Sequence, residues 1–242
     1  MKFPDPLIPG KLIKRYKRFL TDVELANGDV VVAHCANSGS MLSVKEPGAD
    51  VWLSPARNPD RKLRYTWELI RIGKTLVGIN TALANGIVEQ AILDGTIAEL
   101  SGYETLRREV KYGKNSRIDI LLQDPARPTC YVEVKNVTLK REPGGEGPVE
   151  FPDSVTTRGA KHLVELSDMV RDGHRATMVY LVQRTDADHF SVAADIDPDY
   201  ASALDKAMAA GVEVLCYGCN LSLEEIKVSG PLRMKVTVNA KP

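Results

Sequence analysis

The alternation of apolar and polar residues predicts two neighbouring β-strands in the middle of the chain, at residues 117–122 and 130–135. The turn-forming segment 123–129 joins them. Successive side chains of a strand point to opposite faces, so Glu133 and Lys135 lie side by side on one face of the second strand. An acid and a base are therefore presented together on one sheet surface.

Asp119 lies in the first of these strands between two isoleucines, where a carboxylate is costly unless it is paired or bound to a metal. If the strands pair antiparallel, Asp119 can approach Glu133. Carboxylate oxygens are the ligands that Mg²⁺ prefers, and a lysine beside a metal can orient or activate a water. Taken alone, the three residues fit a simpler interpretation better, namely two surface charges and a salt bridge on a solvated sheet face. The surrounding chain changes this weighting.

Residues 1–79 have an all-β pattern. Short strands are predicted at residues 19–25, 30–34, 50–54, 65–72 and 74–79, with a hairpin turn at Asn27-Gly28. About five short strands with interleaved basic and aromatic residues predict a small barrel of the OB type.

The formal net charge of zero, from 32 basic and 32 acidic residues, is unevenly distributed. Residues 1–80 contain 13 Lys and Arg and 8 Asp and Glu, a net charge of +5, and the rest of the chain has −5. Clustered basic residues indicate a nucleic-acid surface, although a solvated basic face is the alternative. The DNA contacts predicted for this domain are Lys14, Arg15, Tyr16, Arg18, Arg61, Arg64 and Tyr65. The two tyrosines could stack on bases or belong to the core.

Two helices of the second half present polar candidates. The first is predicted at residues 80–94, and its Glu89 lies off the apolar stripe as either a solvent-facing acid or a metal ligand. The second is predicted at residues 157–171. Arg158, Lys161 and His162 share one of its faces, which suits phosphate binding or is an ordinary solvated face.

Strands at residues 106–110, 176–183 and 212–217 and a helix at residues 199–210 complete the pattern. The alternation of strands and helices indicates that residues 80–242 form an α/β domain with some parallel pairing. Cys216 and Cys219 have no second pair at zinc spacing, so we expect two reduced thiols and no zinc.

The polar, turn-rich segment HCANSGSM at residues 34–41 could cradle an anion with its backbone amides or serve as a tight structural loop. No apolar run is long enough to span a membrane, and the first residues lack the apolar core of a signal peptide. Four scattered cysteines favour a reducing, cytoplasmic setting. The sequence leaves open whether the protein forms a homodimer.

The strand order with an acid on one strand and Glu-x-Lys on the next resembles the core of PD-(D/E)XK nucleases. More of the chain resembles the sugar fermentation stimulation protein A (SfsA) family. The motifs that carry this resemblance are PGKLIKRYKRFL, HCANSGSM, RKLRYTWELI, VGINTALAN, YGKNSRIDILL, YVEVKNVTL, FPDSVTTRGAKHL and IDPDYA. It implies an OB-like domain, a nuclease-like domain, DNA binding, and a role in regulating sugar (maltose) metabolism.

The resulting hypothesis is a DNA-binding protein with a Mg²⁺- or Mn²⁺-dependent nuclease site. Asp119 and Glu133 would hold the metal with the Val134 carbonyl, and Lys135 would position or deprotonate the attacking water. Arg158, Lys161 and His162 would contact the phosphodiester. One rival is a non-catalytic DNA-binding regulator with a relic nuclease fold, and a weaker one is a protein directed at RNA.

Overall fold

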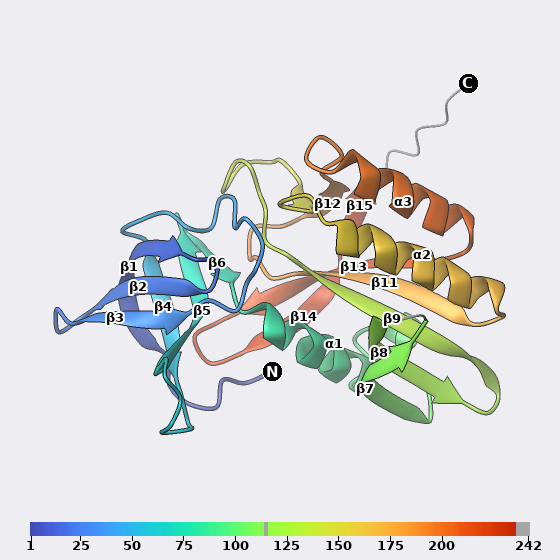
Figure 1. The fold of residues 1–242 in the computed structure, drawn as a ribbon, viewed down its shortest axis with the longest axis horizontal. Helices are drawn as coiled ribbons and strands as arrows, with labels where there is room; N and C mark the ends of the chain where they lie inside the picture. Colours follow the sequence, from blue (N-terminus) through green and yellow to red (C-terminus); the bar gives the residue numbers. More distant parts are fainter. Residues whose placement is uncertain (114–115, 236–242) are drawn as a thin grey trace.

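The computed structural model describes residues 1–113 and 116–235 and shows two lobes side by side (Figure 1). The first lobe is built from strands, and the second has a mixed sheet covered by helices. The sequence-based prediction of a mixed α/β protein with an N-terminal barrel is confirmed. Within the described residues, every helix is too short or too polar to cross a membrane.

Five strands form the barrel: β1 (Ile8–Tyr16), β2 (Leu20–Leu25), β3 (Val30–His34), β4 (Asp50–Pro55) and β5 (Tyr65–Ile72). They pair antiparallel in the order β3-β2-β1-β4-β5, and a parallel pairing of β3 with β5 closes the sheet. A further strand, β6 (Thr75–Gly78), extends β5 as a hairpin. Gly28 has φ 86°, as the predicted Asn27-Gly28 turn requires. The strand β1 is absent from the strands predicted from the sequence.

The barrel core is apolar and closely packed. Leu12, Val23, Leu53 and Trp67 are buried in it. Trp52 is buried elsewhere, in the core of the second lobe. By contrast, the aromatic residues Tyr16, Phe19 and Tyr65 remain accessible.

The chain enters the second lobe at Asn80, whose side chain accepts a hydrogen bond from the Ala82 amide (3.1 Å). This cap begins a 3₁₀ turn, η1 (Thr81–Leu83), which leads into α1 (Ala84–Leu93). The predicted helix is therefore present, with a tighter first turn. Its apolar stripe is buried, and Gly95 follows with φ 81°, as a helix stop requires.

The second lobe contains a six-stranded sheet in the order β14-β13-β11-β9-β8-β7. Its strands are β7 (Thr105–Tyr112), β8 (Ser116–Asp124), β9 (Arg127–Val137), β11 (Arg175–Val182), β13 (Glu213–Leu221) and β14 (Ile226–Pro231). The strands β9, β11 and β13 are parallel, and the remaining neighbours are antiparallel. This mixed sheet matches the prediction.

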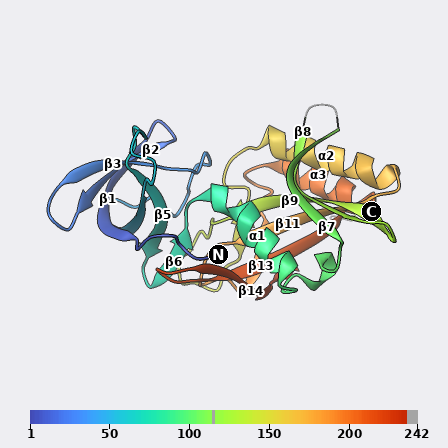
Figure 2. The ribbon, with the colours of Figure 1, turned by 90° about the horizontal axis from the view of Figure 1, so that it is seen from below.

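Helices cover both faces of this sheet. α2 (Thr157–Arg171) and α3 (Pro198–Ala209) pack on one face and α1 on the other (Figures 1 and 2). The bounds of α2 are those predicted, and α3 begins one residue earlier than predicted, at Pro198 after the Asp197 cap. A short turn, η2 (Ala98–Leu100), follows α1. A small parallel sheet joins β10 (Val149–Phe151), β12 (His189–Val192) and β15 (Arg233–Lys235).

Hydrogen bonds fix the two lobes against each other. The Gly78 amide donates to the Gln183 carbonyl (2.9 Å), and the Met41 amide donates to Oδ2 of Asp153 (2.7 Å). The hydroxyl of Thr81 donates to the Ala36 carbonyl (2.7 Å). The space between the lobes is consequently bounded by walls that are tied together at several points.

Candidate metal and nucleic-acid site

The hairpin of β8 and β9 brings the predicted carboxylates together. The two strands pair antiparallel, as predicted, with Ile120 opposite Val132. Continued by one residue, this register places Asp119 opposite Glu133, and both residues line the same cleft. Oδ2 of Asp119 accepts a hydrogen bond from the Val134 amide (2.8 Å), which holds the carboxylate at the edge of β9.

Glu133 is almost fully buried and has two basic neighbours. Its Oε1 accepts a hydrogen bond from Nζ of Lys135 (2.7 Å) and contacts Nδ1 of His162. Nε2 of His162 faces Nε of Arg158, a donor, at 3.2 Å. Because a neutral imidazole has one donor and one acceptor, this arrangement assigns the His162 proton to Nδ1, which donates to Glu133.

The second oxygen of Glu133, Oε2, is buried and has no hydrogen-bond partner among the described residues. A buried carboxylate oxygen without a partner is unfavourable in a folded protein. The orphaned atom lies beside the cleft, where a bound cation would satisfy it.

The two carboxyl groups have different proton affinities. Burial and the nearby charge of Glu133 raise the pKa of Asp119 to about 6, against the hydrogen bonds from Val134 and Asn85. Burial also acts to raise the pKa of Glu133, but the hydrogen bond from His162 and the charge of Lys135 outweigh it and lower that pKa. Glu133 is thus kept ionised, whereas Asp119 needs a further positive charge to ionise fully near neutral pH.

These donors fit a hard divalent cation. In a β-strand the N–H and C=O of one residue point to the same edge, so the Val134 carbonyl is directed to the side on which its amide meets Asp119. Two carboxylates and one carbonyl leave the remaining positions to water, which is the usual arrangement for Mg²⁺. Within residues 1–113 and 116–235, no three His, Cys, Asp or Glu side chains lie close enough together to hold a metal ion by themselves. A cation at this site would therefore depend on the Val134 carbonyl and water as well as on the two carboxylates.

Asn85 belongs to the site and was not predicted. Its Nδ2 donates to Oδ1 of Asp119 (2.9 Å) and to Oε1 of Glu109 (3.0 Å). It precedes Glu89 by one helical turn, so the same polar face of α1 contains both. Glu89 itself pairs with Arg108 (3.3 Å), and the cleft is lined by Asn85 instead.

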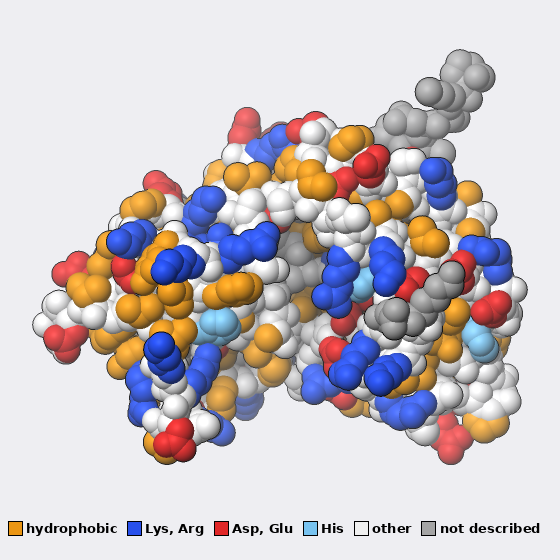
Figure 3. All heavy atoms as spheres, viewed as in Figure 1, with side chains coloured by type: hydrophobic (Ala, Val, Ile, Leu, Met, Phe, Trp, Pro, Cys, Tyr) orange, Lys and Arg blue, Asp and Glu red, His pale blue; other side chains and the backbone are white. Residues whose placement is uncertain are grey.

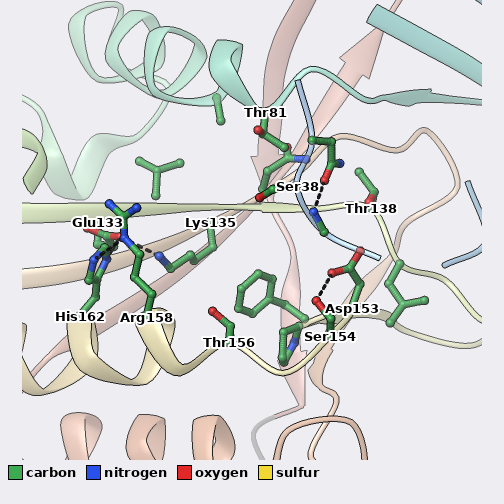
Figure 4. Close-up of a pocket in the computed structure, with 18 of the residues that line it drawn as sticks. Ser38, Thr81, Glu133, Lys135, Thr138, Asp153, Ser154, Thr156, Arg158 and His162 are labelled. Carbon is green, nitrogen blue, oxygen red and sulfur yellow. Dashed lines mark hydrogen bonds and ion pairs between the residues drawn. The ribbon is translucent and has the colours of Figure 1, made fainter. Parts of the chain in front are cut away.

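The cleft has a volume of about 450 Å³, and both lobes contribute to its walls. Figure 4 shows Glu133, Lys135, Arg158 and His162 gathered at one end. Hydroxyl and amide side chains line much of the rest. The barrel side provides Arg18, Asn37, Ser38 and Gly39, and the second lobe provides Thr138, Ser154, Thr156 and Arg158.

The helical residues predicted to bind phosphate lie in three different settings. Arg158 lines the cleft. His162 is directed at Glu133 and so positions that carboxylate. Lys161 is absent from the cleft lining, because its Nζ lies near Oε1 of Glu165 (3.5 Å) and Oγ of Ser116 (3.4 Å). The structure brings Arg158 and His162 to the end of the cleft that contains Glu133 and leaves Lys161 outside it.

The loop at residues 35–41 is a wall of the cleft that two side chains hold in place. The Arg15 guanidinium donates to the carbonyls of Asn37 (2.8 Å) and Gly39 (3.0 Å), and Oγ of Ser40 donates to the Asp153 carbonyl. A Cβ on Gly39 would lie 2.7 Å from the Asp153 carboxylate, so the close approach requires glycine. Arg15 therefore acts in the structure as a support of this loop.

The remaining predicted contacts lie mostly on the barrel surface. Tyr16, Arg64 and Tyr65 line a groove of about 640 Å³, together with Leu20, Val31, Val32, Lys62 and Leu63. The Tyr16 hydroxyl donates to Asp22 (2.9 Å), and Nζ of Lys14 lies over the Tyr16 ring (5.4 Å). Arg61 is half-buried outside this groove, where its charge acts on Glu68.

The cysteines lie in the cores. Cys35 is fully buried. The preceding residue, His34, stacks on Phe19 with 6.3 Å between ring centroids. Cys216 and Cys219 belong to the core clusters on opposite faces of the sheet. Their thiols therefore point away from each other.

A closed OB barrel joined to a sheet-rich α/β domain with a recessed Asp, Glu and Lys group defines a particular class of two-domain protein. Residues 13–79 match the family model described as "SfsA N-terminal OB domain". Residues 82–225 match the "Sugar fermentation stimulation protein RE domain". The chain belongs to the sugar fermentation stimulation protein family.

Relatives in this family are similar over nearly their whole length. The sugar fermentation stimulation protein homolog of Rhodospirillum rubrum is 64% identical over 228 residues, 91% of this chain and 93% of the relative. The homolog of Paramagnetospirillum magneticum is 57% identical over 237 residues, 98% of this chain and 99% of the relative. The solved structure of Pyrococcus furiosus SfsA in complex with Ca²⁺ is 28% identical with a TM-score of 0.87, covering 97% of this chain and 98% of that one.

Proposed function

We propose that this protein binds DNA and that its second lobe is a divalent-metal-dependent nuclease, which hydrolyses phosphodiester bonds. The observation that carries the proposal is the meeting of Asp119, Glu133 and Lys135 in one cleft, with an oxygen of Glu133 left unpartnered. The relative from Pyrococcus furiosus was solved in complex with Ca²⁺. This adds support, because Ca²⁺ and Mg²⁺ share oxygen ligands.

The cleft residues suit phosphodiester chemistry. Asp119, Glu133 and the Val134 carbonyl would hold Mg²⁺ or Mn²⁺, which would supply Lewis-acid polarisation of a phosphate and a more acidic bound water. Lys135, fixed by Glu133, would orient the attacking water and stabilise charge that develops on the phosphate. Arg18 and Arg158, on opposite walls, would attract the phosphodiester into the cleft.

A second candidate function is a non-catalytic DNA-binding regulator of sugar (maltose) metabolism. The hydrogen bonds around Asp119 favour it, because both oxygens already have donors in the Asn85 side chain and the Val134 amide. Such a carboxylate can be stable without a metal. The two candidates differ in whether the cleft turns over a substrate.

A nuclease assay on single-stranded, duplex and branched DNA with Mg²⁺ or Mn²⁺ separates them. Lys135→Ala should bind DNA nearly normally and cleave at least about 10²-fold more slowly, the usual scale for one positioned catalytic group. Lys206→Ala, an exposed lysine of α3, is the matched control and should cleave like the parent protein. Normal binding without cleavage of any of these DNAs would favour the regulator.

A further inference from the structure

Two hollows on the protein share one hairpin. Tyr16 and Leu20, at the ends of β1 and β2, line the groove on the barrel. Arg18, at the tip between these strands, lines the cleft that contains Glu133. A ligand that leaves the barrel groove at this end therefore meets Arg18 and then the carboxylates.

The hairpin tip has an unfavourable backbone. Lys17 has φ 47° and Arg18 has φ 63°, which is the left-handed region that side chains with a Cβ avoid. Neither residue is glycine or asparagine, the usual occupants of such positions. Strained backbone of this kind is concentrated at functional sites.

The barrel groove has the chemistry of a base-stacking surface. Its floor is apolar, with the rings of Tyr16 and Tyr65, and its rim includes the cations Lys62 and Arg64. Figure 3 shows apolar side chains on this lobe bordered by Lys and Arg, with further Lys and Arg on both sides of the hollow between the lobes. Aromatic rings can stack on bases of a single strand, because each base then has a free face.

The cleft is also better suited to one strand than to two. Glu133 is only 2% exposed, so a phosphate has to enter the cleft to reach it. The walls on either side are joined by the contact of Met41 with Asp153 and by the packing of Gly39 on the same carboxylate. A duplex has its phosphates on a wide, stiff cylinder that does not enter a recess of this kind.

We propose that the protein binds a single-stranded segment of DNA, whose bases stack in the groove of Tyr16 and Tyr65 and whose backbone passes Arg18 into the cleft. The cleavage half of this inference rests on the proposed function, and the binding half does not. The net charge of +5 on residues 1–80 and the basic rim favour a polyanion over a neutral oligosaccharide, the other ligand that OB barrels bind.

Binding is measured by fluorescence anisotropy in EDTA, with a labelled single-stranded oligodeoxynucleotide and a duplex of equal length at one salt concentration. The single strand should bind at least about tenfold more tightly. Tyr65→Ala should weaken single-strand binding about tenfold, the scale of one stacked base, and leave duplex binding nearly unchanged. Tyr65→Phe keeps the ring and should bind like the parent protein, which separates lost stacking from lost folding.

The hairpin is tested with a pair of neighbouring variants. Arg18→Ala should weaken binding of the single strand more than that of the duplex. Lys17 is the neighbouring basic residue, has similar backbone geometry, and lines neither the groove nor the cleft. Lys17→Ala should therefore affect the binding of both DNAs equally. If Arg18→Ala and Lys17→Ala behave alike, the path through the cleft is wrong.

Cleavage in Mg²⁺ is then compared on the same two DNAs. A single-strand preference in EDTA without cleavage would remove the proposed nuclease function and keep the strand path. Duplex binding as tight as single-strand binding, insensitive to Tyr65→Ala, would overturn the strand path. Cleavage of that duplex would still support the nuclease.

Discussion

At the scale of single residues, the two carboxylates of the site, Asp119 and Glu133, differ in the charge of their hydrogen-bond partners. Glu133 is stabilised as an anion by His162 and Lys135, whereas Asp119 has only neutral donors in its direct hydrogen bonds. The difference follows from which groups the fold brings to each oxygen. Asp119, Glu133 and Lys135 could be predicted from a single hairpin. Asn85 could not, because its role depends on the packing of α1 against β8 across 34 residues of chain.

The raised pKa of Asp119 has a consequence for stability in the absence of metal. With a folded pKa of about 6 and an unfolded value near 3.9, the folded state holds the proton more tightly. The stabilisation is present below pH 4 and is lost as the pH rises through 6. The loss at pH 7.5 is at most about 3 kcal/mol.

Asp119→Asn removes this titration. In EDTA, its free energy of unfolding relative to the parent protein should increase between pH 4.5 and pH 7.5 by about 2 kcal/mol, because part of the stabilisation is already lost at pH 4.5. Urea denaturation at the two pH values measures the change, and the acid effects common to both proteins cancel. A difference that is the same at both pH values would mean that Asp119 titrates normally.

At the scale of elements, strands with clear alternation and helices with clear caps were predictable. The helix α2 has its expected bounds, because Thr156 caps it and its apolar residues recur at helical spacing. The strand β1 gave little signal, since only Leu12 of its nine residues is buried and its other positions are largely basic or turn-forming. The loop predicted at residues 123–129 is tighter than expected, because Oδ1 of Asp124 accepts the Ala126 amide (2.8 Å) and closes the turn early.

The β1–β2 hairpin lowers the folding stability, because Arg18 is held in a left-handed conformation while its side chain lines the cleft. Arg18→Gly should relieve the left-handed conformation and stabilise the protein by about 1 kcal/mol or less, after allowing for the greater freedom of glycine in the unfolded chain. The same change should weaken single-strand binding. Thermal unfolding and anisotropy on one preparation measure both effects.

Lys17→Gly is the matched variant, with the same relief and no loss of the Arg18 charge. It should be stabilised to a similar extent and retain the preference for the single strand. Loss of the preference in both variants would assign it to the rigidity of the turn, not to the Arg18 side chain.

At the scale of the whole molecule, the barrel supplies positive charge and the second lobe supplies the carboxylates. The charge counts of the two parts of the chain and the pattern of the Asp119 and Glu133 strands indicated this division, but the cleft depends on contacts between residues far apart in the chain, such as Met41 with Asp153. Arg15 illustrates the limit of sequence reasoning. It belongs to a basic cluster, yet its guanidinium is directed at backbone carbonyls of the cleft loop.

If the barrel neutralises about five phosphates, the logarithm of the binding constant should fall with the logarithm of salt concentration with a slope of about −3.5 for a single strand and −4.5 for a duplex. Arg18→Glu and Arg64→Glu should each flatten the slope. Lys206→Glu, on α3, should leave it unchanged. An unchanged slope in the two arginine variants would place the DNA on another surface.

Trp52 begins in barrel strand β4 but packs with Leu69 in the core of the second lobe, and Trp67 lies in the core of the barrel. These are the two tryptophans of the chain, and because they lie in different cores, their fluorescence reports different events. In a variant that keeps only Trp52, the fluorescence emission spectrum reports whether the lobes remain docked. Separation of the lobes would expose the indole to water and shift its emission maximum to longer wavelength. In a variant that keeps only Trp67, it reports the folding of the barrel. The protein thus contains its own optical probe of the seam on which the cleft depends.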